Sequence, residues 1–358
     1  MTLTPLARHL VRLIEETGPI PLSQYMALAL GHPEYGYYMT RDPLGARGDF
    51  ITAPEVSQMF GELVGLWLAD QWRQQGAPKR FALAELGPGR GTLMADALRA
   101  IGAVPGMTEA ASIHLVETSP ALRAAQRERV PQAIWHAHIR ELPELPLFLV
   151  ANEFFDALPV TQYQRTSKGW CERFVGYEGG KFVPVLAPVP AANADTLPAA
   201  TRRAREGEIA EVSPASTAIA ETIAARIAAD GGAALVIDYG HAASAPGDTL
   251  QAVRHHEFAD PFEAPGDADI TVHVDFEALS HAVRAGGAEP HGPVDQGTFL
   301  VALGIDTRAE ALMRQATAGQ KETIAKARRR LTATDEMGSL FKVLGITPRG
   351  VPLPAGFA

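Results

Sequence analysis

Apolar and polar residues in the first part of the chain alternate with the period of amphipathic helices. Residues 4–17 place leucines and an isoleucine at helical spacing, with arginines and glutamates between them. Further helices are predicted over residues 22–30 and 55–75, and Gly18-Pro19 forms a break before the first of them. The segment 32–55 has little periodicity but is rich in aromatic residues and glycine. A loop of this length within a compact protein is typical of a functional segment.

From residue 79 onwards, short apolar runs alternate with amphipathic helices. This rhythm predicts right-handed βαβ units and a mostly parallel sheet, so the predicted fold class is α/β. The predicted core strands and helices cover residues 81–86, 92–101, 112–117, 120–129, 133–136, 147–151, 213–229, 233–239 and 275–285.

Two other regions have a different pattern. A glycine-separated set of alternating segments predicts an inserted antiparallel β element with strands at 160–165, 171–177 and 181–186. Near the C-terminus, strands are predicted near residues 298–304 and 340–346, on either side of a basic helix over 308–331.

Composition narrows the class of protein. The 358 residues are 46% hydrophobic, which is enough for a sizeable core, and the formal net charge of −9 argues against nonspecific nucleic-acid binding. The single cysteine, Cys171, excludes an internal disulfide framework and a cysteine-rich zinc site. The charged N-terminal residues and the absence of a long apolar run predict a cytoplasmic protein without membrane insertion.

The stretch ALAELGPGRGTL, residues 82–93, joins a predicted strand to a predicted helix through Gly87, Gly89 and Gly91. Glycines in such a turn let the backbone approach a ligand closely. Glu85 precedes the turn, and Glu117 ends the next predicted strand, where a carboxylate can accept both hydroxyls of a ribose. An acid beside the turn suits the ammonium and sulfonium of S-adenosylmethionine (SAM) better than a pyrophosphate. SAM is therefore the expected cofactor, with NAD as the alternative; Glu117 could instead only cap the following helix.

Several longer segments resemble those of the MidA-type methyltransferases: FITAPEVSQMFGE, ELGPGRGTL, ANEFFDALPV, VIDYG, ADITVHVDF and MGSLFKVL. The resemblance extends over nearly the whole chain. It implies a class I SAM-methyltransferase core over residues 79–358, preceded by a helical segment and lid loop over 1–78. Inserted substrate-facing elements are expected at about 160–212 and 241–275.

Candidate acceptor-binding residues follow the fourth core strand, which should end beside the methyl group. Glu153 and Asp156 are expected to grip the acceptor, with Asn152 orienting it, because carboxylates suit a guanidinium. Asp238, at the end of the fifth core strand, is a second-rank acceptor contact. Glu153 or Asp156 could instead only cap the following turn.

The loop before the sheet supplies further candidates. Asp49 and Thr52 are expected to contact the cofactor from a lid, although an ordered helix entry would explain Thr52 as well. His273 could abstract a proton or only brace its loop. His255 and His256 lack a matching carboxylate cluster, so no metal is expected.

Mitochondrial members of the resembled family act on an arginine of the 49 kDa subunit of respiratory complex I, and they assist assembly of that complex. The resemblance thus implies a protein-arginine methyltransferase, although the acceptor of bacterial members is left open. The alternatives are a SAM-dependent enzyme with a small-molecule acceptor and a non-catalytic assembly factor that retains the fold. The sequence does not predict the oligomeric state.

Overall fold

The computed structural model describes residues 3–40, 52–192, 194, 197–254 and 256–358. The chain divides into two compact units, each built from segments distant in sequence. Unit 1 consists of Met1–Phe50, Asp156–Ala218 and Ala243–Ala278, and unit 2 consists of Ile51–Phe155, Ile219–Ala242 and Leu279–Ala358.

Unit 2 contains the mostly parallel sheet that the βαβ rhythm predicts. Its strand order is β4-β3-β2-β5-β10-β16-β15; the strands from β4 to β10 are parallel, and β16 is antiparallel to both of its neighbours. The bounds are β2 Phe81–Leu86, β3 Ala111–Val116, β4 Ile134–His136, β5 Leu147–Asn152, β10 Gly232–His241, β15 Glu289–Asp295 and β16 Phe341–Thr347.

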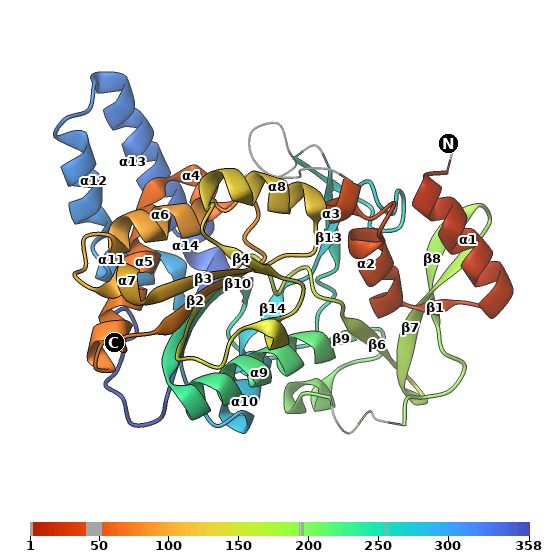
Figure 1. The fold of residues 1–358 in the computed structure, drawn as a ribbon. Coiled ribbons are helices and arrows are strands. Elements are labelled where there is room, and N and C mark those ends of the chain that lie inside the picture. Colours follow the sequence, from red (N-terminus) through yellow and green to blue (C-terminus); the bar gives the residue numbers. More distant parts are fainter. Residues whose placement is uncertain (1–2, 41–51, 193, 195–196, 255) are drawn as a thin grey trace. The chain divides into compact units, whose positions relative to one another are not determined.

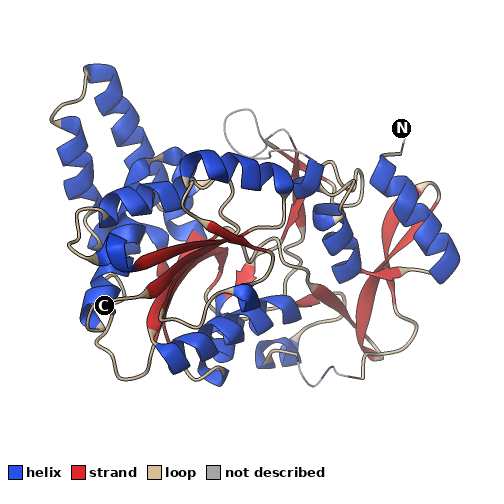
Figure 2. Cartoon of the chain, in the orientation of Figure 1, coloured by secondary structure: helices blue, strands red, loops and turns tan. Residues whose placement is uncertain are grey.

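Helices lie on both faces of this sheet (Figure 2). They are α4 Ala53–Val56, α5 Gln58–Gln74, α6 Thr92–Ile101, α7 Met107–Ala110, α8 Pro120–Arg129, α11 Gln296–Ala302, α12 Ile305–Met313, α13 Ala318–Thr332 and α14 Met337–Leu340, together with most of α9 Pro214–Asp230 and part of α10 Phe276–Ala285.

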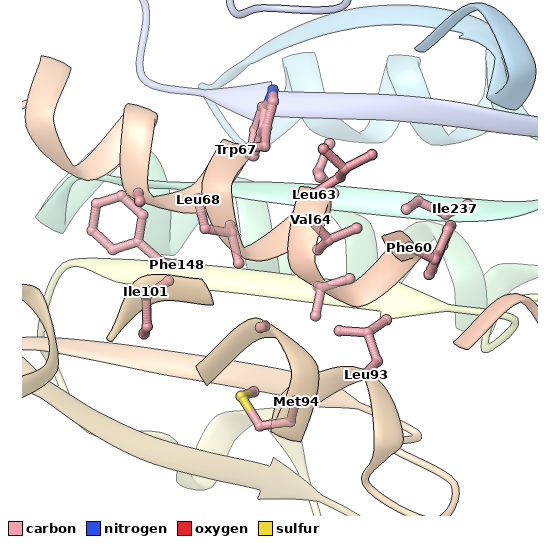
Figure 3. Close-up of a cluster of buried hydrophobic side chains, with 14 of the residues drawn as sticks. Phe60, Leu63, Val64, Trp67, Leu68, Leu93, Met94, Ile101, Phe148 and Ile237 are labelled. Carbon is pink, nitrogen blue, oxygen red and sulfur yellow. The ribbon is translucent and has the colours of Figure 1, made fainter. Parts of the chain in front are cut away.

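The main core lies between α5, α6 and one face of the sheet (Figure 3). Phe60, Leu63 and Val64 of α5 share it with Met94 of α6 and Phe148 of β5. Every second residue of the central strands points into this cluster, as the two-residue period of a strand requires. The sheet and the two helices therefore share one packed core, which positions the strand ends.

Glycine makes the close packing of α5 on α6 possible. A Cβ added at Gly65 would lie 2.7 Å from Cα and 2.8 Å from the carbonyl oxygen of Ala97 in α6. A Cβ at Gly61 would lie 2.7 Å from Cβ of Asp96. All three distances are shorter than real Cβ contacts, so a larger residue would push the helices apart.

Unit 1 has its own sheets and core. One sheet has the order β1-β7-β6-β9 with β8 paired to β7, and a second has the order β12-β11-β13. Pairing of β6, β7 and β8 is antiparallel, which confirms the predicted β insertion. The elements are α1 Pro5–Thr17, α2 Leu22–Gly31, α3 Tyr37–Thr40, β1 Ile20–Pro21, β6 Thr161–Thr166, β7 Gly169–Glu178, β8 Lys181–Leu186, β9 Ile209–Val212, β11 Gln251–Arg254, β12 Glu257–Ala259, β13 Asp269–Thr271 and β14 Val274–Asp275.

The core of unit 1 joins its N-terminal helices to its strands. Leu10 of α1 and Met26 of α2 are buried together with Val175 of β7 and Ile270 of β13. In contrast to α1–α3, helix α5 belongs to unit 2. The domain boundary expected near residue 78 stays a prediction.

Two predictions near the C-terminus are wrong. Residues 298–304, predicted as a strand, belong largely to helix α11, whose Phe299 and Leu300 are buried in the main core. A short apolar run cannot distinguish these two cases. The basic helix predicted over 308–331 is two helices, α12 and α13, and Thr317 begins the second through a capping box with Gln320.

A smaller difference affects the helix predicted over residues 55–75. Ser57 adopts an extended conformation and separates α4 from α5, and its side chain accepts a hydrogen bond from the backbone of Met59. Within the described residues, no helix combines the length and the apolar character that a membrane span requires.

The close approach of α5 and α6 yields a stability prediction. Gly65→Ala should lower the free energy of unfolding by roughly 1–3 kcal/mol, because its Cβ meets the backbone of Ala97. Gly319→Ala is the control, since a Cβ there meets nothing within 4 Å on an exposed helix, and its stability should be unchanged or slightly raised. Urea titration measures both; equal stabilities for the two variants would contradict the packing argument.

Candidate active site

The turn between β2 and α6 exposes its backbone at the carboxyl end of the sheet. Gly87, Gly89 and Gly91 all have positive φ angles, of 59°, 52° and 79°. A Cβ at Gly87 would also lie 2.9 Å from Cδ2 of Phe154. Conformation disfavours a side chain at all three positions, and at Gly87 the space does as well, so the turn can present bare backbone to a ligand.

Glu85 belongs to β2, and one residue, Leu86, separates it from the glycine turn. Its side chain is almost completely buried, with 3% exposure. Burial raises the pKa of its carboxyl from 4.5 to about 8, although the backbone N–H of Met94 donates a hydrogen bond that opposes the shift. The oxygen Oε2 has no hydrogen-bond partner within the described residues. A buried carboxyl oxygen without a partner is costly, and a cationic ligand could supply the missing partner.

Glu117 follows β3 at the same edge of the sheet. Its Oε1 accepts a hydrogen bond from the backbone N–H of Ser119 at 2.8 Å, and its Oε2 accepts one from Nε2 of Gln126 at 3.3 Å. Burial raises the pKa of this carboxyl, and these hydrogen bonds oppose the rise. Glu117 thus holds the backbone at the start of α8, as the capping alternative proposed. A carboxylate can accept further hydrogen bonds, so this contact leaves room for a ligand.

Gln126 is a residue that the sequence reasoning missed. Its Nε2 also donates to the carbonyl oxygen of Gly89 at 2.7 Å, while its Oε1 accepts from Nε1 of Trp135 at 2.8 Å. It thereby joins the glycine turn to Glu117. A single glutamine in an amphipathic helix carries no signal from which this role could have been found.

The turn after β5 carries Asn152 and Glu153. Glu153 has a positive φ of 49°, an uncommon conformation for a residue with a side chain. Its Oε1 accepts hydrogen bonds from Nδ2 of Asn152 at 3.1 Å and from the backbone N–H of Ala53 at 3.2 Å. Oδ1 of Asn152 is buried and has no partner in the part of the chain that the structure describes.

Asp238 of β10 holds that turn in place. Its Oδ2 accepts backbone hydrogen bonds from Phe154 at 3.2 Å and Phe155 at 3.0 Å, and its Oδ1 accepts one from Tyr239 at 3.0 Å. Asp238 is fully buried. This geometry favours a positioning role over direct contact with an acceptor.

Of the two lid candidates, Asp49 and Thr52, the structure describes only Thr52. Asp49 is outside the described residues. Thr52 is the N-cap residue of α4, but its side chain makes no capping hydrogen bond in the structure as described. Oε1 of Glu55, within α4, accepts a hydrogen bond from Oγ1 of Thr92 at 2.5 Å and so ties α4 to the start of α6.

Asp156 and His273 belong to unit 1, and their predicted roles stay predictions. Asp156 is buried, and its carbonyl oxygen accepts a hydrogen bond from the N–H of Val272 at 3.0 Å. The backbone N–H of His273 donates to Oγ1 of Thr249 at 3.0 Å. Among the described residues, no group of three or more His, Cys, Asp or Glu side chains is placed to hold a metal ion.

A mostly parallel sheet with an acid, a glycine turn and a second acid at its carboxyl edge defines a Rossmann-like nucleotide-cofactor enzyme. Comparison with known proteins makes the class specific. Residues 63–294 match the family described as "Putative S-adenosyl-L-methionine-dependent methyltransferase". The chain belongs to this family of SAM-dependent methyltransferases.

Relatives are similar over nearly the whole chain. Protein arginine methyltransferase NDUFAF7 of Mus musculus is 38% identical, over 96% of this chain and 85% of that protein, and its Drosophila melanogaster homologue gives the same values. A crystal structure of a methyl transferase-type protein from Burkholderia thailandensis, bound to S-adenosyl-homocysteine, has 32% identity and a TM-score of 0.86. That match covers 98% of this chain and 93% of the other, and it confirms the class I methyltransferase fold.

The cofactor is therefore SAM, as predicted, and the residues present fit it. The unpartnered Oε2 of Glu85 and Oδ1 of Asn152 are buried acceptors at the same strand ends as the open glycine turn. SAM carries an ammonium group and a sulfonium, so acceptors of this kind match its charge. Which residue touches which group of SAM is a proposal, made below.

Burial of Glu85 predicts an unusual pH dependence of stability. Because its pKa is raised from 4.5 to about 8, the folded protein without cofactor holds this proton more tightly than the unfolded chain. The contribution is fully present below about pH 4.5 and is lost as pH rises through about 8. Glu85→Gln should therefore be more stable than wild type at pH 8, by roughly 1–4 kcal/mol, with little difference at pH 5.

Urea titration at several pH values without SAM measures this difference. Glu144→Gln, on an exposed loop of the same unit, is the control and should follow the wild-type curve. If Glu85→Gln and wild type lost stability in parallel from pH 5 to pH 8, Glu85 would not be the buried acid described here.

Proposed function

We propose that this enzyme transfers a methyl group from SAM to an arginine of a protein, with the 49 kDa-type subunit of respiratory complex I as the candidate acceptor. The observation that carries the proposal is the 36–38% identity, over at least 95% of this chain, to proteins named protein arginine methyltransferase. Glu153, an acid in the turn after β5, supports it, because a guanidinium is always charged at neutral pH.

The cofactor contacts follow from the glycine turn. Glu85 accepts from the ammonium group, and the raised pKa of its carboxyl returns towards the usual range when this cation binds. Glu117 accepts from the ribose hydroxyls and is oriented by Gln126. The amides at the start of α6, beyond Gly91, and the bare turn complete the contact surface.

The acceptor contacts are placed on Asn152 and Glu153. Bound SAM would supply an electrophilic methyl carbon: its bond to sulfur would break, leaving S-adenosyl-homocysteine, as a bond to the arginine nitrogen formed, and that nitrogen would release one proton to solvent. Glu153 holds the guanidinium in a charge-assisted hydrogen bond and orients the attacking nitrogen. Asp238 fixes the backbone on which Glu153 stands. Asp156 remains a second predicted acceptor contact, and Thr52 and Asp49 remain predicted lid contacts.

We place the activity in the cytoplasm. The one cysteine of the chain, Cys171, is buried and unpaired with any other cysteine, which suits a reducing compartment.

The test is methyl transfer from labelled SAM to the purified 49 kDa-type subunit. Wild type should label one arginine, and Glu153→Gln should lower kcat by roughly 10²–10³-fold while SAM affinity changes little, because the lost charge acts on the acceptor. Glu144→Gln, an exposed acid of the same unit, should match wild type.

Other outcomes distinguish the alternatives. If wild type binds SAM but labels no protein, a small-molecule acceptor or a non-catalytic assembly role becomes the better account. If Glu153→Gln labels the subunit at the wild-type rate, the assignment of the acceptor contact is wrong.

A further inference from the structure

Helix α4 is a single turn whose hydrogen bonds reach both turns at the carboxyl end of the unit 2 sheet. It contacts α5 and α6 (Figure 1). The backbone N–H groups of Glu55 and Val56 both donate to the carbonyl oxygen of Thr52, at 2.9 and 3.1 Å, and close the turn. A helix this short is not stable alone, so its position is set by the groups to which it is bonded.

The side chain of Glu55 bonds α4 to the beginning of α6. Its Oε1 accepts a hydrogen bond from Oγ1 of Thr92 at 2.5 Å, and Thr92 directly follows Gly91 of the glycine turn. A carboxylate at the beginning of a helix is also stabilised by the helix dipole. This bond therefore holds α4 to the segment on which the cofactor is proposed to lie.

The backbone at the start of α4 bonds to the residue proposed to hold the acceptor. The N–H of Ala53 donates to Oε1 of Glu153 at 3.2 Å, and Ala53 is fully buried in the main core. The same oxygen accepts a hydrogen bond from Nδ2 of Asn152 at 3.1 Å. Two donors from different segments thus direct one oxygen of Glu153, and α4 supplies one of them.

The glycine turn and the turn after β5 also touch directly. A Cβ at Gly87 would lie 2.9 Å from Cδ2 of Phe154, so the aromatic ring lies against the bare backbone of the glycine turn. The strands that lead into the two turns are neighbours, with Leu86 of β2 paired to Ala151 of β5. Packed groups of unit 2 therefore connect the two turns without a gap, which is the physical requirement for coupling between them.

Cofactor binding would change the group that holds the first turn of α6. The backbone N–H of Met94, in that turn, donates to the buried carboxyl of Glu85, whose pKa is raised to about 8. In the proposed binding mode, the ammonium group of SAM favours the ionised form of this carboxyl. The bond from Met94 then becomes charge-assisted and stronger, and it tightens the turn that also contains Thr92.

We infer that Glu55 is a positioning residue that links cofactor binding at the glycine turn to the orientation of Glu153, through Thr92 and helix α4. The inference rests on the proposed function, in which Glu153 holds the arginine. Because SAM and the acceptor then favour the same position of α4, each should raise the affinity of the enzyme for the other.

The first test needs no acceptor. Amide hydrogen exchange of the peptide that contains α4 is measured with and without saturating S-adenosyl-homocysteine. In wild type, the ligand should slow this exchange by roughly threefold or more. Thr92→Val and Glu55→Ala remove the same bond from opposite sides, and both should lose most of the slowing. Thr92→Ser keeps the hydroxyl and should restore it.

Thr323→Val is the matched control for the exchange measurement, because the hydroxyl of Thr323 donates to the carbonyl oxygen of Gly319 within its own exposed helix. This variant should behave as wild type. If the ligand binds wild type without slowing exchange in α4, the link is contradicted. The wild-type slowing in both Thr92→Val and Glu55→Ala would contradict it equally.

A double-mutant cycle with the 49 kDa-type subunit tests whether Glu55 acts through Glu153. Glu55→Ala should lower kcat roughly tenfold in the wild-type background and have little further effect in Glu153→Gln. Glu55→Gln keeps an oxygen that can accept from Thr92, so it should recover most of the lost kcat. An equal effect of Glu55→Ala in both backgrounds would indicate general structural damage and overturn the inference, while the proposed function would stand. If wild type labels no subunit, the proposed function and the inference both fail.

Discussion

The structure depends on a carboxyl group buried at the end of a central strand. Glu85 lies between two parallel neighbours, β3 and β5, in the middle of the sheet. Burial keeps its carboxyl protonated at neutral pH, and one of its oxygens has no hydrogen-bond partner among the described residues. Such a group costs stability in a folded protein. In the proposed binding mode, a cationic group of the cofactor removes this cost when it binds.

The second constraint is the use of backbone rather than side chains at the strand ends. The glycine turn needs positive φ at three positions, and the turn after β5 needs it at Glu153. Gln126 holds the first turn through the carbonyl oxygen of Gly89, and Asp238 holds the second through two backbone N–H groups. Both are buried polar residues that orient the backbone, so the ligand-facing positions need little rearrangement when ligands bind.

Much of this arrangement could be predicted from sequence, because it follows from periodicity and local chemistry. The parallel strands are continuous apolar runs, and the turn that contains Gly87 has a glycine spacing with a physical requirement behind it. What could not be predicted depends on tertiary contacts. Phe299 lies in a short apolar segment that is buried in the main core and packs on Phe357 near the C-terminus. The role of Gln126 depends on three partners that lie 9 to 37 residues away along the chain. Asp238 ends a strand as expected, but only the structure reveals which backbone groups it accepts from.

The central claim is tested most directly by a crystal structure of the protein with S-adenosyl-homocysteine. The account predicts that the ligand lies over Gly87–Gly91, with its ammonium group within hydrogen-bond distance of Glu85 and its ribose hydroxyls on Glu117. A complex in which the ligand binds elsewhere, or in which Oε2 of Glu85 stays buried away from it, would contradict the account.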